Sequence, residues 1–245
     1  MLHWLLSPID PTRAHEIGLA LSWHARLMVL SWGILTPTAV LIARFYKIRP
    51  RQNWPQDLDN RLWWNAHYLG QSASFVIASV ALILILISQQ NTGSVLVHRV
   101  LGYMIMSLGT LQILSGLFRG TKGGATAPQS DGSLRGDHYD MTRRRLVFEL
   151  VHKSVGYTTI GLIVVALLSG LWEANAPHWM WLCIGGWLSL LIVVAVFLQR
   201  RGYAYDTYQA IWGPDLEHPG NNMPKQGFGV VRPSECARFK VEEGE

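Results

Sequence analysis

HARLMVLSWGILTPTAVLIARFYK, residues 24–47, contains no charged residue between Arg26 and Arg44. A run of this length covers the roughly 30 Å hydrocarbon core of a bilayer as one helix, which satisfies its own backbone hydrogen bonds in lipid. Of the chain's 245 residues only 15% are charged, whereas a soluble domain has about 25%. This composition excludes a disordered chain, a disulfide scaffold and an ordinary soluble enzyme. It predicts an integral membrane protein.

The same apolar pattern recurs four more times along the chain. We therefore expect an all-α membrane protein with five transmembrane helices, the first four forming a bundle. The expected helices are 22–44, 64–88, 95–118, 146–172 and 178–199. An outer segment, 1–21, precedes the membrane domain 22–199, and either lies at the membrane interface or extends the first helix outward. A cytoplasmic tail, 200–245, follows the domain, and we expect it to be irregular.

The distribution of Lys and Arg predicts how the chain is oriented. Five helices put the termini on opposite sides, and 17 of the 21 basic residues fall on the side of the tail. The positive-inside rule makes that side cytoplasmic, with the N-terminus outside a plasma or bacterial inner membrane. Topology and an anionic lipid neighbour account for the net charge of +5, so we expect no nucleic acid as a partner. Cys183 and Cys236 are not expected to form a disulfide.

Four of the nine His residues lie within the first four expected helices, one in each: His24, His67, His98 and His152. Ionisable residues are rare in membrane helices and mark functional sites. Each His lies near the start of its helix. Because alternate helices run in opposite directions, His24 and His98 share an outer level, and His67 and His152 share an inner level. Two imidazoles at one depth suit a six-coordinate haem b. The pattern predicts two bis-His haems b and no separate catalytic residue.

Other residues close to these His are candidate contacts for the cofactor. Gly102 and Gly156 follow their His by four residues and Gly70 by three, which puts each on the His face of its helix. A missing side chain there lets a flat macrocycle approach, although small residues also serve ordinary helix packing. Arg99 and Lys153 directly follow a His and are candidates to contact the haem propionates.

Haem-free explanations of the four His stay open. They are hydrogen bonding between helices and a proton relay in a transporter. A relay usually includes buried carboxylates, and Glu149 is the only one near the set. A zinc site is less favoured, because two His at one level do not complete its coordination shell.

HARLMVLSWGILTPTAVLIARFYK, WWNAHYLGQS, VHRVLGY and ELVHKSVGYTTI resemble the four core helices of cytochrome b561 domains. The resemblance is closest to the b561 domain of proteins that also carry a DOMON domain, and it covers about residues 22–172. It implies a four-helix core that holds two haems b and transfers electrons across a membrane. It pairs His24 with His98 and His67 with His152, the same pairing that depth predicts.

The chain also departs from the family pattern. Members usually have six helices, whereas we expect five, with none before the core. We also expect no DOMON domain, since only about 21 residues precede the core and such a domain needs about 100. An ascorbate donor does not follow from the resemblance, because the basic residues that ascorbate-using members rely on are not placed here.

The leading hypothesis is a diheme membrane cytochrome that moves electrons between an outer redox partner and a quinone or a cytoplasmic partner. With both axial positions filled, the iron has no open position, which favours outer-sphere transfer. Whether the chain is itself an oxidoreductase, such as a ferric or quinone reductase, stays open, as does a homodimer. Alternatives are the membrane-anchor cytochrome b subunit of a dehydrogenase or hydrogenase, an assembly subunit of a larger membrane complex, and a haem-free transporter or scaffold.

Overall fold

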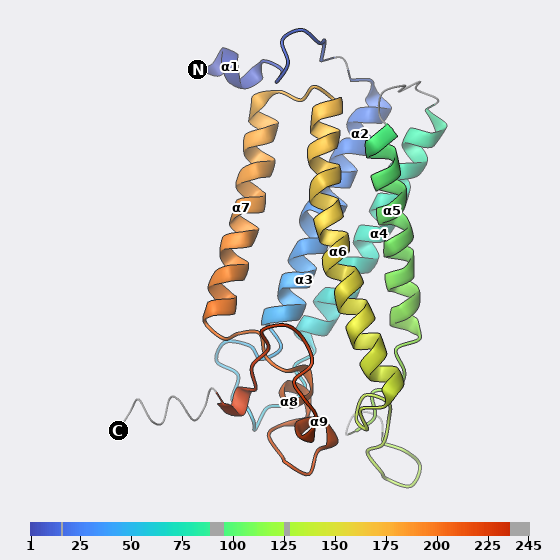
Figure 1. Ribbon diagram of the computed structural model, residues 1–245, viewed down its shortest axis with the longest axis vertical. Coiled ribbons are helices and arrows are strands. Elements are labelled where there is room, and N and C mark those ends of the chain that lie inside the picture. The colour runs from blue at the N-terminus through green and yellow to red at the C-terminus, as the bar shows by residue number, and fades with distance from the viewer. Residues whose placement is uncertain (16, 89–95, 125–127, 236–245) are drawn as a thin grey trace. The chain divides into compact units, whose positions relative to one another are not determined.

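The computed structural model describes residues 1–15, 17–88, 96–124 and 128–235. Its regular structure within these ranges is helical, apart from isolated bridges between Pro8 and Pro177 and between Tyr205 and Val231. Cys236 lies outside the described residues. In chain order the elements are α1 (Leu2–Leu6), α2 (Leu19–Met28), the π-helix η1 (Val29–Leu35), α3 (Thr36–Phe45), α4 (Leu62–Ile87), α5 (Leu96–Leu117), α6 (Arg143–Glu173), α7 (His178–Arg200), α8 (Thr207–Trp212) and α9 (Pro219–Asn222) (Figure 1).

Five helical spans are long and apolar enough to cross a membrane, as the sequence predicts. They are Leu19–Phe45, which joins α2, η1 and α3, followed by α4, α5, α6 and α7. The expected ends hold to within three residues. α6 begins three residues earlier than expected, so that Arg143, Arg144 and Arg145 form its first turn. Length and composition place these helices in a lipid bilayer.

The first span changes helix type at its centre. Pro37 has no N–H and cannot donate to the carbonyl of Gly33 four residues earlier, so the hydrogen-bond ladder is interrupted there. The π-helix η1 lies just before this proline, and the Gly33 carbonyl accepts a hydrogen bond from Trp187 Nε1 at 2.8 Å. Ser31 O accepts from Ser74 Oγ at 2.8 Å in addition to Thr36 N, five residues later. The first span is thus π-helical just before Pro37.

The chain divides into two compact units, and each of the five spans contributes residues to both. The first unit comprises Met1–Ala39, Tyr68–Thr110 and Tyr157–Ala195. Its apolar core draws on the first four spans, as expected for a four-helix core, and consists of Trp32, Ala78, Ile105, Ile163 and Ala166.

The second unit contains the tail and comprises Val40–His67, Leu111–Gly156 and Val196–Glu245. The tail is more ordered than the sequence predicts. Asp206 accepts hydrogen bonds from Tyr208 N and Gln209 N and so begins α8, and every residue from Thr207 to Ile211 is buried. Lys47, in the loop after α3, donates to Tyr205 O at 2.7 Å and ties that loop to the tail.

Only Leu19–Leu21 of the N-terminal segment extend the first span. α1 is a separate short helix, and residues between it and α2 contact the turn between α6 and α7. Met1, Leu2, Trp4 and Leu6 are exposed.

Candidate functional site

In the first unit, His24 of α2 and His98 of α5 face one another. Their ring centres are 6.3 Å apart and the ring planes meet at 78°, so the rings are not stacked. His24 Nδ1 lies 2.9 Å from Ala81 O of α4. His98 Nδ1 lies 3.1 Å from Ala166 O and 3.1 Å from Ser169 Oγ, both of α6. Four spans thus build this site, which we call the His24–His98 site.

These contacts fix the chemical form of both imidazoles. A backbone carbonyl only accepts hydrogen bonds, so the nitrogen that faces it carries the proton. His24 and His98 therefore each donate from Nδ1–H, which leaves the lone pair on Nε2 available for a metal ion. Outer-shell bonds of this kind orient histidine ligands at metal sites.

In the second unit, His67 of α4 and His152 of α6 form a similar pair, the His67–His152 site. The ring centres are 6.2 Å apart and the planes meet at 75°. His152 Nδ1 lies 3.3 Å from Ser115 Oγ, which itself donates to Gln112 O at 2.9 Å. Because the Ser115 proton is used in that bond, His152 donates from Nδ1–H and its Nε2 is available as well. Phe148 stacks on the His152 ring with centres 5.0 Å apart.

The separation within each pair fits two ligands on opposite sides of one metal ion. An imidazole nitrogen binds a transition metal at about 2.0 Å, which puts the centres of two opposed rings about 6 Å apart. Within the described ranges, no group of three or more His, Cys, Asp or Glu side chains is placed to hold a metal ion. For a metal ion held by such a pair, a cofactor would supply the other ligands, as porphyrin nitrogens do in a haem. The residues present therefore fit a bis-His haem.

Comparison with known proteins supports a b-type membrane cytochrome in general. Three proteins of Arabidopsis thaliana are similar to the chain: a cytochrome b561, DM13 and DOMON domain-containing protein, 25% identical over 73% of the chain, and two cytochrome b561 and DOMON domain-containing proteins, 28% and 25% identical over 66% and 71%. The chain is cytochrome b561-like. It spans only 18%, 34% and 37% of the length of these relatives. No family model and no solved structure matches it.

The three candidate glycines of this b561-like chain have different surroundings. A Cβ on Gly70 would lie 2.8 Å from Ala39 Cβ, so close packing of α4 against α3 explains that glycine. A Cβ on Gly156 would be in ordinary contact with Gln112 Nε2 at 3.5 Å, and one on Gly102 would meet nothing within 4 Å. Gly102 is thus the candidate whose surroundings leave room for a flat cofactor.

A comparison of alanine variants separates packing from cofactor contact. We expect Gly70→Ala to destabilise the protein by about 1–3 kcal/mol, because its new methyl overlaps Ala39. Gly102→Ala should leave stability within about 0.5 kcal/mol but weaken haem retention. Gly161→Ala is the control, since it too meets nothing within 4 Å. Melting and haem-release rates measure both effects, and equal haem retention in the Gly102 and Gly161 variants would remove Gly102 from the site.

The two candidate cations differ in their surroundings. Arg99 is exposed. Lys153 forms an ion pair with Glu149 and also donates to Gln226 O of the tail at 3.2 Å. Glu149 is buried and pairs in addition with Arg145 at 2.7 Å. A contact between Lys153 and a haem propionate would therefore compete with the ion pair between Lys153 and Glu149, which the sequence did not predict.

Charged and titratable groups of the loops and tail add to the electrostatics of the second unit. Burial lowers the pKa of Lys47 to about 7, and the positive charge of Lys153 lowers it further. The negative charges of Glu149 and Asp206 oppose this shift. Burial also lowers the pKa of His138 to about 3, assisted by the positive charge of Arg145. Both groups are buried. The neutral form of His138 is thus the one the folded protein holds.

Burial of His138 predicts that the second unit loses stability in acid. Its pKa lies near 3 in the folded state against an ordinary 6.5, so only the unfolded chain binds a proton between these values. The contribution of neutral His138 to the free energy of unfolding is then fully present above pH 6.5, and it is lost as the pH is lowered toward 3. We expect His138→Phe to reduce the drop in melting temperature between about pH 7 and about pH 5. His3→Phe, at an exposed site, is the control, and an identical drop in all three proteins would contradict the prediction.

Several residues of the two sites were not predicted. Ser169 and Ser115 were detectable as polar residues inside apolar spans. Gly170 lies so close to His98 that a Cβ there would be 3.0 Å from its Cε1. The acceptors Ala81 O and Ala166 O are backbone atoms, so no side-chain pattern in the sequence indicates them.

Proposed function

We propose that the chain is a diheme b-type membrane cytochrome that transfers electrons between a redox partner outside the membrane and a quinone or cytoplasmic partner. The observation that carries the proposal is the pair of His–His sites, with ring centres 6.3 Å and 6.2 Å apart. Similarity to cytochrome b561 domain proteins supports it independently.

In this proposal His24 and His98 hold one haem, and His67 and His152 hold the other. When bound, each haem supplies an iron that exchanges one electron and has no open coordination position for a substrate. The protein orients each ligand: Ala81 O and Ala166 O accept the Nδ1 protons in one site. Such acceptors make the imidazole a more basic ligand, which is one way a protein adjusts a redox potential.

The orientation in the membrane follows from the basic residues. The second unit contains the tail and the basic residues at the ends of three spans: Arg44 in α3, Arg143, Arg144 and Arg145 in α6, and Arg200 in α7, which Arg201 follows. The positive-inside rule places this unit on the cytoplasmic side and the N-terminus outside, in a plasma or bacterial inner membrane. The His67–His152 site is then the one on the cytoplasmic side.

Sealed vesicles containing the purified full chain test the proposed transfer. Ferricyanide trapped inside should be reduced when dithionite is added outside, and the absorption of both haems should respond. His98→Ala and His152→Ala, which each remove one ligand, should lower the rate to that of protein-free vesicles. A haem-loaded protein whose trapped acceptor is untouched would contradict transfer across the membrane. A folded but colourless protein would instead favour the haem-free alternatives.

A further inference from the structure

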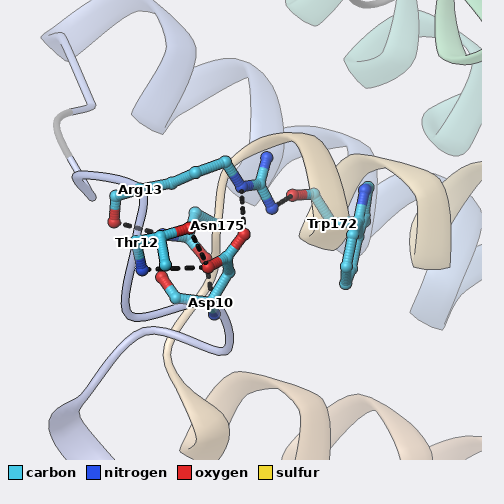
Figure 2. A network of polar contacts seen from close by, with 5 residues as sticks. All are labelled: Asp10, Thr12, Arg13, Trp172 and Asn175. Atoms are coloured by element: carbon cyan, nitrogen blue, oxygen red, sulfur yellow. Dashed lines mark hydrogen bonds and ion pairs between the residues drawn. The ribbon is translucent and has the colours of Figure 1, made fainter.

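A short N-terminal segment, Ser7–His15, lies against the turn at the end of α6, where backbone bonds from Ile9 N to Ala176 O and from His178 N to Ser7 O are joined by the contacts of one buried side chain (Figure 2). Asn175, only 2% exposed, lies in the turn between α6 and α7. Its Oδ1 accepts from Asp10 N at 3.0 Å, and its Nδ2 donates to Asp10 O at 3.0 Å and to Arg13 O at 2.7 Å. All three side-chain hydrogen bonds of Asn175 therefore go to the N-terminal segment.

The N-terminal segment in turn donates to two carbonyls at and just beyond the end of α6, one of which, Trp172 O, also accepts from Asn175 N at 3.0 Å. Arg13 Nη2 donates to Trp172 O at 2.9 Å, and its guanidinium lies 5.0 Å from the centre of the Trp172 ring. His15 Nδ1 lies 2.8 Å from Ala174 O. The segment thus adds contacts from outside the helix to the last turn of α6 and to the residue after it.

The adjoining turn of α6 supports the ring of His98. Ala166 O and Ser169 Oγ lie 3.1 Å from His98 Nδ1, and Gly170 is the residue whose Cβ would crowd the ring at 3.0 Å. Only one residue separates Gly170 from Trp172, where Arg13 binds. A displacement at the end of α6 therefore changes the distance between His98 and its hydrogen-bond acceptors.

We propose that Asn175 and the N-terminal segment are positioning elements for His98, and that they set the redox potential of the His24–His98 site. The inference rests on the proposed haem ligation. A short Nδ1–H···O bond makes the His98 imidazole a more basic ligand, which stabilises the ferric state. Releasing the end of α6 lengthens that bond, so the potential of this site rises. The His67–His152 site has its own outer-shell partners, Ser115 and Phe148, and does not respond.

Asn175→Ala, which removes all three bonds without changing charge, tests the proposal. Redox titration of the purified full chain should show one of two midpoint potentials shifted upward. The low-spin ferric electron paramagnetic resonance signal of that site, identified as the one missing in His98→Ala, should shift as well. The matched control is Asn221→Ala, another buried asparagine, whose Nδ2 donates to Gly213 O and Asp215 O in the second unit. It should leave both the potential and the signal of the His24–His98 site unchanged.

Arg13→Lys is the second variant, for the case that Asn175→Ala does not fold. It keeps the charge at a partly exposed position and loses the planar guanidinium on Trp172. We expect a smaller shift in the same direction. Folded variants with unchanged potential and unchanged signal at the His24–His98 site would overturn the proposal, as would an equal shift in Asn221→Ala. Wild-type protein without haem would instead overturn the proposed function, so the two failures are distinguishable.

Discussion

Replacing His98 with Ala is expected to remove one haem b and leave the second in place. The His98 ring is paired with that of His24 at 6.3 Å, and both belong to the first unit. His67 and His152 are paired in the second unit and retain their partners. A bis-His haem that loses one axial ligand is bound by a single remaining bond and is lost during purification. The expected haem content therefore falls by half.

A pyridine haemochrome assay on purified protein measures this haem content. His178→Ala is the control, because His178 Nδ1 contacts Ser7 O and its ring lies against Trp4 rather than against another His. We expect that variant to keep the full haem content. Loss of both haems in His98→Ala would mean that the pairing is wrong or that folding requires the His24–His98 site to be filled, and full retention would remove His98 as a ligand.

Replacing Glu149 with Gln is expected to destabilise the protein by about 3–5 kcal/mol, because it breaks a buried ion pair and leaves charge uncompensated. The Glu149 side chain is 5% exposed and pairs with both Arg145 and Lys153. It lies on α6 within one turn of His152. We therefore also expect the variant to retain less haem at the His67–His152 site than at the other.

Thermal and denaturant unfolding in detergent measure the stability change. Glu235→Gln is a matched control, since Glu235 pairs with Lys225 while its side chain is 43% exposed. An exposed pair contributes about 0–1 kcal/mol. Equal stabilities of the Glu149 and Glu235 variants would contradict the role of the buried carboxylate.

The spans and the histidine pairs were predictable because single-residue properties determine them. Long apolar runs require helices in lipid, and the position of each His along its helix predicted the pairs that the rings form. The surroundings of the π-helix were not predictable from Pro37 alone, because Trp187 donates to Gly33 O and Ser74 donates to Ser31 O from other spans. Which neighbours lie beside a residue is decided by packing between distant segments.

Packing between distant segments also explains why the surroundings of the glycines and of the two terminal segments could not be predicted. Gly70 and Gly102 have similar spacings from a His, yet only Gly70 faces a close methyl group, that of Ala39. In the polar tail, nothing in the local pattern shows that Tyr208 is completely buried. The role of Asn175 depends on a segment more than 150 residues earlier in the chain, which its helical neighbours do not reveal.

The central claim is two haems b, each held by one His pair, and a haem count on the wild-type chain tests it most directly. A dithionite-reduced minus oxidised spectrum of purified protein, combined with the pyridine haemochrome assay, gives both the haem type and the number per chain. We predict b-type bands and about two haems per chain, one for each bis-His site. A well-folded protein from haem-replete cells with no haem would contradict the claim, and a single haem would contradict one of the two sites.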